Sequence, residues 1–292
     1  MRVDSPLDEK HMQSDAHGEP LVSFLLPAYN AEDTVVQAID SILGQRGAPF
    51  ELVIVDDGST DGTADRIAEA IEGDMRVRFI QQENQGTGGA LRTAIQHAKG
   101  QWFIMSGADD WFPPDSLERR IAFMQDNPGY AIYSTAFYYV YDNGTQEVFP
   151  AWDTVRSVTF EQEIEFPWIN GLSLFSREAY EAVGGFDSRF YNEDYDLWLR
   201  ILLNGYRHIF QPEPLAYYRI HSSQKTHDIL KQRQGDIEIF RSLLDSGLLN
   251  AEQTVLVEAA IHKFKRNIAL RQVLYRFLGR NNTEKLIAKV YR

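Results

Sequence analysis

Short apolar runs alternate with amphipathic stretches through the first half of the chain. Three near-continuous runs are typical of strands buried on both faces of a parallel sheet; they are Leu21–Leu26, Phe50–Val55 and Trp102–Met105, and a further strand is predicted at Val77–Gln81. Apolar residues at helical spacing follow each predicted strand, within 31–43, 63–71, 84–97 and 115–127. This alternation predicts an α/β fold whose mostly parallel sheet is flanked by helices. Asn30 is the expected N-cap of the first helix.

The pattern loosens in the second half. Two apolar runs joined by Asp142-Asn143-Gly144 predict a β-hairpin, because Asn-Gly favours tight hairpin turns. The hairpin strands are 130–141 and 146–149, followed by candidate strands at 168–175 and 215–220 and candidate helices at 177–183 and 191–204. From Gln224 onward only helical patterns remain. We therefore expect a leader at 1–20, one α/β domain at 21–222 and a helical appendage at 223–292.

Composition limits the class of protein. The hydrophobic content of 43% in 292 residues is sufficient for a packed core. The chain has no cysteine, which excludes disulfides and thiolate zinc sites and makes the cytoplasm the default compartment. No apolar run approaches the roughly 20 residues that span a bilayer, and the leader lacks the apolar core of a signal peptide.

The charge is unevenly distributed. A formal charge of −13 argues against general nucleic-acid binding. Nine Lys or Arg against one Glu give 263–292 a charge of +8, which leaves −21 on the rest, so the two ends are expected to meet different partners. Apolar residues in this tail are spaced for a helix that either docks on the rest of the protein or lies on an anionic membrane; they are Phe264, Ile268, Leu270, Val273, Leu274, Phe277 and Leu278.

Polar clusters follow the four predicted parallel strands. They are 27–30, 56–61, 84–89 and the pair Asp109-Asp110. Because ligands bind beyond the carboxyl ends of such strands, these loops are expected to converge on one crevice. Adjacent acids at a strand tip need a cation or hydrogen-bond donors. The alternative for this pair is an acidic loop that caps the helix beginning near Ser116.

Two other functional classes are excluded by spacing. Asp57–Gly62 begins like a calcium-binding EF-hand loop, but Ala68 stands where the twelfth residue should be a bidentate Glu. Gly86–Leu91 begins like a dinucleotide fingerprint, but Leu91 replaces the third glycine and the loop follows a later strand than the first.

Six motifs in order and spacing resemble family 2 glycosyltransferases. They are Val22–Asn30, Val53–Asp61, Asn84–Gly89, Ala108–Asp110, Asn192–Arg200 and Tyr218–His221, and the resemblance covers about Leu21 to Ser223. The implied fold is GT-A, which is Rossmann-like, with a nucleotide-binding half at 21–112 and an acceptor half at 113–222. The implied activity is that of a hexosyltransferase that inverts the sugar of a nucleoside diphosphate donor, usually a UDP-sugar.

The resemblance also assigns roles to residues. Pro27, Tyr29, Asn30 and Asp57 would line the base and ribose pocket together with Gly86, and Asp57 would accept the uracil N–H; its alternative role is a turn or helix cap, which Asp61 could equally supply. Asp109 would face the ribose or the metal, and Asp110 would bind Mg²⁺ or Mn²⁺. His221 matches a position that can complete the metal site, or it is merely structural.

One departure from the family pattern affects the metal site. Gly107 stands where many members carry another Asp, so the metal would depend on Asp109 and Asp110, as one or two carboxylates plus substrate phosphates commonly hold Mg²⁺. The alternative is a non-catalytic module that binds the nucleotide-sugar.

Asp194, next to Glu193, matches the general base of the family. The base would take the proton of the hydroxyl that attacks the anomeric carbon; the alternative is a capping acid at the start of a helix. The implied acceptor is a glycan or a lipid-linked saccharide, and the expected location is the cytoplasm or the inner face of the membrane, contacted through 263–292.

Overall fold

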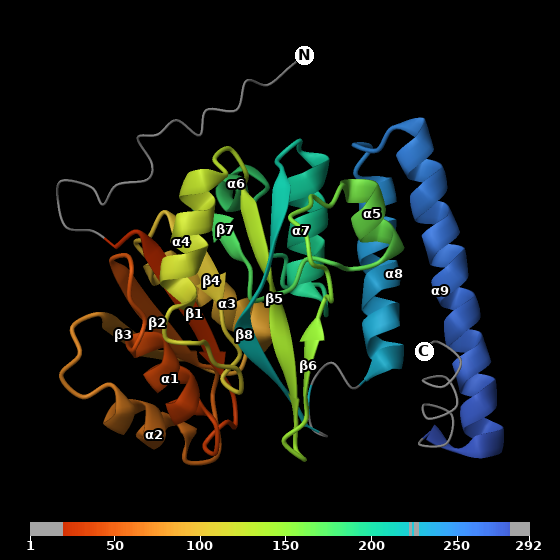
Figure 1. Ribbon diagram of the computed structural model, residues 1–292. Coiled ribbons are helices and arrows are strands. Elements are labelled where there is room, and N and C mark those ends of the chain that lie inside the picture. The colour runs from red at the N-terminus through yellow and green to blue at the C-terminus, as the bar shows by residue number, and fades with distance from the viewer. Residues whose placement is uncertain (1–19, 222–223, 225–227, 281–292) are drawn as a thin grey trace. The chain divides into compact units, whose positions relative to one another are not determined.

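The computed structural model describes residues 20–221, 224 and 228–280 (Figure 1). The chain forms two compact units. The larger contains the described residues up to Arg189 and those from Glu193 to His221, and the smaller contains Phe190–Asn192 and the described residues from Gln224 onward. The expected leader lies outside the described residues, except for Pro20.

An eight-stranded sheet forms the centre of the larger unit (Figure 1). Its strands are β1 Val22–Ala28, β2 Phe50–Asp56, β3 Val77–Gln81, β4 Trp102–Met105, β5 Ile132–Tyr141, β6 Gln146–Phe149, β7 Leu174–Ser176 and β8 His208–Ile220. The spatial order is β3-β2-β1-β4-β7-β5-β6, with β8 beside β5. Strands β1 to β4 are parallel, β7 is antiparallel to β4 and β5, and β8 is parallel to β5. The predicted mostly parallel sheet is confirmed.

Seven helices accompany the sheet in the described part of the larger unit. They are α1 Val35–Leu43, α2 Thr63–Ala70, α3 Gly86–His97, α4 Ser116–Asp126, α5 Phe160–Glu165, α6 Arg177–Ala182 and α7 Glu193–Leu203. The prediction that Asn30 caps the first helix is wrong, because α1 begins at Val35 after Thr34. Asn30 instead takes a left-handed conformation with φ of 48°, which asparagine tolerates better than most residues.

Two other predictions need correction, and one short helix was not predicted. The expected strand at 168–175 is mostly loop, and its extended part is the short β7. Strand β8 begins at His208, seven residues before the predicted start, and pairs with β5 along most of its length. Helix α5 was not predicted, because six residues offer little helical periodicity.

Apolar side chains fill both faces of the sheet. On one face Phe24 and Leu26 of β1 belong to a core that includes buried residues of α1 and α4. On the other, Phe175 of β7 packs against Phe103 of β4 and edge-on against Trp198 of α7, with ring centroids 5.4 and 5.1 Å apart. Burying each such side chain contributes about 1.5–3 kcal/mol. The packing therefore fixes the carboxyl edge of the sheet, where the predicted site lies.

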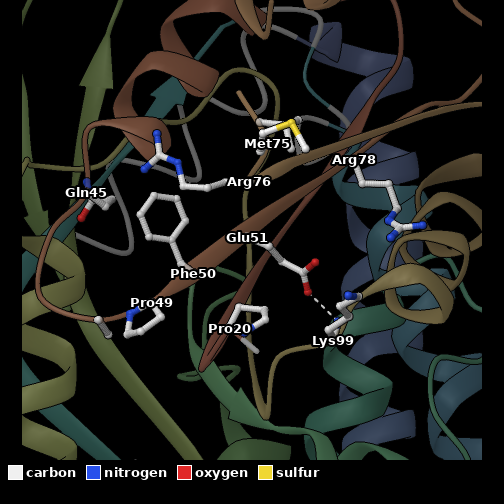
Figure 2. Close-up of a pocket in the computed structure, with 11 residues that line it drawn as sticks. Pro20, Gln45, Pro49, Phe50, Glu51, Met75, Arg76, Arg78 and Lys99 are labelled. Carbon is white, nitrogen blue, oxygen red and sulfur yellow. Dashed lines mark hydrogen bonds between the residues drawn. The ribbon is translucent and has the colours of Figure 1, made fainter. Parts of the chain in front are cut away.

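A hollow of about 700 Å³ lies at the opposite edge, where β2 and β3 begin (Figure 2). Its wall includes Arg76, Arg78, Lys99 and Glu51. The Glu51 carboxylate already has hydrogen-bond partners within the protein, because it accepts the Ser23 hydroxyl at 2.6 Å and the Lys99 backbone N–H at 2.5 Å. None of the predicted site residues lines this hollow.

The smaller unit contains two long helices, α8 Ile229–Asp245 and α9 Ala251–Leu278. Phe264 of α9 is buried against Phe240 of α8, with centroids 5.6 Å apart. Farther along α9, Leu270, Val273, Phe277 and Leu278 are exposed and Ile268 and Leu274 are half-buried, so the predicted apolar stripe is divided into a packed part and a more open part. No helix among the described residues has both the length and the apolar character needed to cross a bilayer.

Candidate active site

The loops after β1 and β2 are joined directly. The Asn30 carboxamide oxygen accepts the N–H of Thr60 at 2.8 Å, and the Asn30 N–H donates to the Ser59 hydroxyl at 3.0 Å. Pro27 lies in β1 beyond its last pairing with β4, which ends at Leu25, so the ladder with β4 does not need its missing N–H. Tyr29 is half exposed beside them.

Asp57 connects the second loop to the third. Its Oδ1 accepts the Gln82 side-chain amide at 2.7 Å and the Gln85 N–H at 2.9 Å. The turn at the start of α2 is held instead by Asp61, which accepts the Thr63 N–H at 3.0 Å. The buried carboxylate of Asp57 therefore orders the approach to α3, where Gly86 has the positive φ that favours glycine.

The start of α7 lies against the first turn of α3 and against the loop before β7. A methyl group on Gly88 would sit 3.5 Å from Cβ of the buried Glu193. A methyl group on Gly171 would sit 3.2 Å from Asp194 Oδ2 and 3.9 Å from the terminal methyl of Met105, the last residue of β4. Asp194 and the side chain of Met105 thus both lie beside Gly171, while Asp194 Oδ1 accepts the Tyr195 N–H at 2.8 Å.

Asp109 and Asp110 lie in the loop after β4, next to the end of β8. Asp109 Oδ2 is 2.9 Å from His221 Nε2, and Asp110 Oδ1 accepts the Arg219 N–H at 3.1 Å. Both carboxylates fill the space over Gly107, where a methyl group would lie 2.5 Å from Asp109 Oδ1 and 2.7 Å from Asp110 Oδ2. A third aspartate at Gly107 would require this acidic pair to move.

Asp110 is a buried acid whose hydrogen bonds and the charge of Arg219 offset only part of the effect of burial. Burial, and then the charge of Asp109, raise the pKa of Asp110 well above its usual value. The guanidinium of Arg219 lies nearby, donating to the Asp109 carbonyl at 3.1 Å and to the Gln37 side chain at 2.6 Å, and it covers the Trp111 ring at 4.8 Å. The loop after β4 is therefore anchored to β8 and to α1.

The acidic pair fits a divalent cation that is held partly by a substrate. The described residues contain no group of three or more His, Asp or Glu side chains arranged to hold a metal. Two carboxylate groups crowded over Gly107, one of them buried, form a charge excess that a cation would relieve. Mg²⁺ is commonly bound through one or two carboxylates plus substrate phosphates, so the donor set matches that mode of binding.

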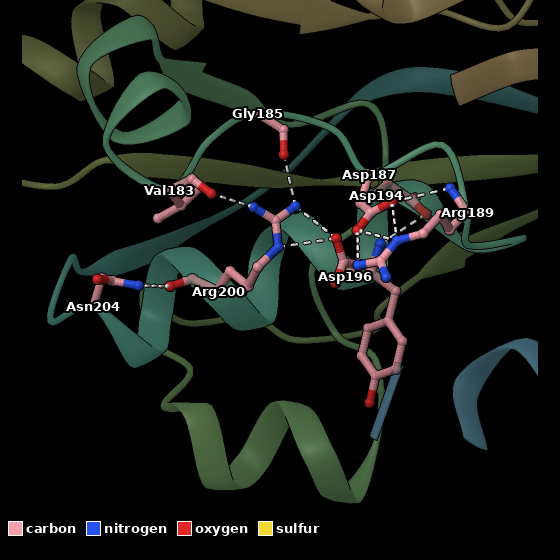
Figure 3. Close-up of polar contacts among 9 residues, drawn as sticks. Val183, Gly185, Asp187, Arg189, Asp194, Asp196, Arg200 and Asn204 are labelled. Carbon is pink, nitrogen blue, oxygen red and sulfur yellow. Dashed lines mark hydrogen bonds and ion pairs between the residues drawn. The ribbon is translucent and has the colours of Figure 1, made fainter. Parts of the chain in front are cut away.

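Helix α7 is fastened by Arg200, which stands in its last turn (Figure 3). The guanidinium donates to Asp196 Oδ2 at 2.9 and 2.5 Å, to the Val183 carbonyl at 2.6 Å and to the Gly185 carbonyl at 2.7 Å. Asp196 is buried, and burial raises the pKa of its carboxyl although Arg200 opposes the shift. This clamp holds the helix that presents Glu193 and Asp194.

Sequence reasoning missed several residues around the predicted ones. Arg219 stands two positions before His221, which directly follows β8, so strand alternation could have placed both side chains on the same side of the chain. Gly171 carries no local signal, because its contact with Asp194 joins distant segments. Arg200 ends the Asn192–Arg200 motif and pairs with Asp196 one helical turn away, but its contacts with the Val183 and Gly185 carbonyls depend on the fold.

Comparison with known proteins agrees with the fold and the motifs. The sequence model of glycosyl transferase family 2 matches residues 23–184. An uncharacterized glycosyltransferase of Rickettsia prowazekii is 29% identical over 86% of this chain and 79% of its own length. A putative teichuronic acid biosynthesis glycosyltransferase of Bacillus subtilis is 30% identical over 69% of this chain and 80% of its own.

Solved structures resemble the fold. S. aureus TarS 1–349 in complex with UDP-GlcNAc has a TM-score of 0.68 at 19% identity, covering 91% of this chain and 75% of that one. The mannosyltransferase PcManGT from Pyrobaculum calidifontis, in complex with GDP-Man and Mn²⁺, has a TM-score of 0.64 at 20% identity, covering 94% and 80%. With the family match over more than half of the sequence, this chain belongs to glycosyl transferase family 2 and is a glycosyltransferase with a GT-A fold.

Proposed function

We propose that this enzyme transfers a hexose, with inversion, from a nucleoside diphosphate sugar to a hydroxyl of a glycan or lipid-linked acceptor, with Asp194 as general base. The observation that carries the proposal is the position of Asp194 against Gly171, beside which the side chain of Met105 at the end of β4 also lies. Asp109 and Asp110 follow the same strand. A base and a diphosphate site at one strand end are what an in-line displacement needs.

The nucleotide would be bound at the joined loops after β1, β2 and β3. Pro27, Tyr29 and Asn30 would border the base and ribose, Asp57 would accept the N–H of uracil, and the N–H groups around Gly86 would face the diphosphate, as helix N-termini favour anions. UDP is the preferred nucleotide because the GT-A neighbour TarS binds UDP-GlcNAc, although a GDP-sugar remains a donor to test, since PcManGT binds GDP-Man.

Asp194 would remove the proton of the acceptor hydroxyl as its oxygen attacks the anomeric carbon on the face opposite the diphosphate. Glu193, buried against Gly88, would hold the start of α7 in place. A positioned base contributes about 10²- to 10⁴-fold to the rate.

Mg²⁺ or Mn²⁺ would be held by Asp110 and Asp109, with His221 beside Asp109. When bound, the cation would offset the charge on the departing diphosphate. The binding of Mn²⁺ by PcManGT supports a divalent metal here.

The first test replaces Asp194 with asparagine. Asn keeps an amide oxygen that can accept the Tyr195 N–H, so Asp194→Asn should melt at nearly the wild-type temperature. Without a base, nucleoside diphosphate release from UDP-GlcNAc or GDP-mannose with Mn²⁺ should fall about 10²- to 10⁴-fold. Asp65→Asn removes an exposed acid from the first turn of α2 and serves as the control for charge at a helix start.

Retained turnover in Asp194→Asn would overturn the assignment of the base. A non-catalytic binding module is the weaker alternative, because the relatives that match along most of their length are described as glycosyltransferases. Such a module would bind UDP-GlcNAc or GDP-mannose in calorimetry without releasing nucleoside diphosphate.

The domain division and location complete the proposal. Residues 21–112 would bind the nucleotide, 113–222 would bind the acceptor, and the helical segment 223–292 would contact an anionic membrane from the cytoplasmic side. The relative in Bacillus subtilis described for teichuronic acid biosynthesis supports a surface polysaccharide as the product.

A further inference from the structure

Glu163 is a fully buried acid outside the motifs that define the family resemblance. It lies in α5, whose first turn is fixed by a capping box between Thr159 and Gln162. Its solvent exposure is 0%, whereas Glu161 and Glu165 of the same helix are exposed. Burying an acid is costly unless its oxygens are hydrogen-bonded, so the partners of this carboxyl group indicate its role.

The carboxyl group of Glu163 holds the beginning of the loop that leads to β7. Its Oε2 accepts the N–H of Trp168 at 3.0 Å and that of Ile169 at 3.3 Å, and Oε1 accepts the Ile169 N–H at 3.3 Å. The next residue, Asn170, donates to the Thr135 carbonyl of β5 at 3.0 Å. This loop, residues 168–172, is therefore fixed by side chains rather than by a strand ladder.

The loop ends against the carboxylate of Asp194. Gly171 lies so close to Asp194 Oδ2 that a methyl group would be 3.2 Å away. Helix α7 is tied to α5 as well, because the Tyr195 hydroxyl donates to the Glu163 carbonyl at 2.9 Å. Glu163 thus contacts both structures that border Asp194, the loop through its side chain and α7 through its backbone.

We propose that Glu163 is a positioning residue of the transfer reaction, which ties down the loop 168–172 and thereby fixes the place of the Asp194 carboxylate. The inference rests on the proposed role of Asp194 as base. It assigns a function to a residue that contacts neither nucleotide nor metal in the proposed site.

The ionisation of Glu163 gives this role a pH signature. Burial raises the pKa of Glu163 to about 8; the N–H groups of Trp168 and Ile169 oppose the shift, and the charge of Asp194 adds to it. Asp194 is the charged group that faces Glu163 from α7, where the other contact is the neutral Tyr195 hydroxyl. Above pH 8 the ionised Glu163 keeps its bonds to the loop but repels the carboxylate of Asp194, so that carboxylate should be displaced and turnover should fall.

Two variants of the full-length chain test the proposal. Glu163→Gln keeps an acceptor oxygen and imitates the protonated acid, whereas Glu163→Leu has a similar volume and no acceptor. Hydrolysis of UDP-GlcNAc and GDP-mannose with Mn²⁺ is measured from pH 6 to 9, well below the melting temperature. Hydrogen exchange of the Trp168 and Ile169 amides reports on the loop, and Glu165→Gln is the exposed control on the same helix.

We expect Glu163→Leu to lower kcat about tenfold or more, because small misplacements of a reacting group are costly, with the donor KM unchanged. The two amides should exchange about tenfold faster, since each loses a hydrogen bond. Glu163→Gln should restore most of the turnover at pH 7 and remove the decline above pH 8.

A folded Glu163→Leu protein with wild-type kcat would overturn the inference. If that variant does not fold, the pH profile decides alone: an alkaline decline that persists unchanged in Glu163→Gln would overturn it equally. Full turnover in Asp194→Asn would instead overturn the proposed function, and this inference with it. Loss of turnover in Asp194→Asn together with an unaffected Glu163→Leu would overturn only the role of Glu163.

Discussion

His208 is a buried imidazole held in one tautomer at the start of β8. Its Nδ1 accepts the Val158 N–H at 3.0 Å, so the proton is on Nε2, which is 2.6 Å from the Ser134 hydroxyl. Burial lowers the pKa of His208 to about 3. The folded protein therefore keeps this histidine neutral at pH values where the unfolded chain protonates it near 6.5.

This difference predicts acid sensitivity. Between pH 6.5 and 3 the unfolded chain binds the extra proton, so stability that is present above pH 6.5 is lost as the pH falls, by at most about 1.4 kcal/mol per pH unit. His208→Gln keeps an acceptor and a donor but does not titrate. From pH 7 to 5 the wild type should lose about 2 kcal/mol more than the variant in urea unfolding. Parallel stability curves would contradict the prediction.

At the scale of elements, α7 depends on the Arg200 clamp. A lysine at this position would keep the positive charge, but its ammonium group lacks the planar guanidinium geometry that donates to one carboxylate and two carbonyls at once. Arg200→Lys should therefore destabilise the protein by about 2–3 kcal/mol, mostly because Asp196 and the two carbonyls lose partners, and should lower kcat because α7 presents Asp194. Differential scanning fluorimetry and donor hydrolysis measure the two effects.

The matched control is Arg66→Lys on α2, where the ion pair with Glu69 is exposed and 3.9 Å long. Such surface pairs contribute about 0–1 kcal/mol. Equal small losses in both variants would show that the clamp does not hold α7.

The elements also show what a sequence can predict. Strands β1, β2 and β4 follow from apolar runs, because a strand buried on both faces leaves a continuous pattern, whereas β3 lies at the edge of the sheet and has no buried residue. In the sequence, the apolar residues Trp168, Ile169 and Leu172 make the stretch 168–173 resemble a strand. In the structure, its backbone N–H groups instead donate to the side chains of Glu163 and Asn170. Nothing local distinguishes those bonds from a ladder, since they depend on residues brought together by the fold.

The residues of the candidate site likewise fall into two groups: those that the sequence identifies and those that only the fold brings together. Acids such as Asp57, Asp110 and Asp194 stand in motifs whose spacing is visible in the sequence. Arg219 and Gly171 lie beside them through strand pairing and loop packing, which single-sequence patterns do not encode. The sequence therefore identifies the reacting groups better than the groups that position them.

At the scale of the whole molecule, the charge is separated along the chain. Residues 263–280 contain six Lys or Arg and no acid, whereas the chain as a whole carries −13. Residues 281–292, which carry the rest of the predicted basic tail, lie outside the described residues. Within α9 the side chains of Leu270, Val273 and Phe277, spaced three and four apart, are 55%, 50% and 81% exposed. Exposed apolar side chains beside a run of basic residues fit an anionic lipid surface.

We expect the full-length protein to co-sediment with vesicles that contain phosphatidylserine and to remain in solution with phosphatidylcholine alone, because each Lys or Arg near an anionic surface contributes about 1 kcal/mol. Salt at about 0.5 M should release it, since screening shortens the range of these charges. Val273→Ser with Phe277→Ser should weaken binding by removing the exposed apolar contact, whereas Leu248→Ser, exposed in the turn before α9, should not. Membrane contact through this helix would be refuted if vesicle binding depended on neither lipid charge, nor salt, nor the double substitution.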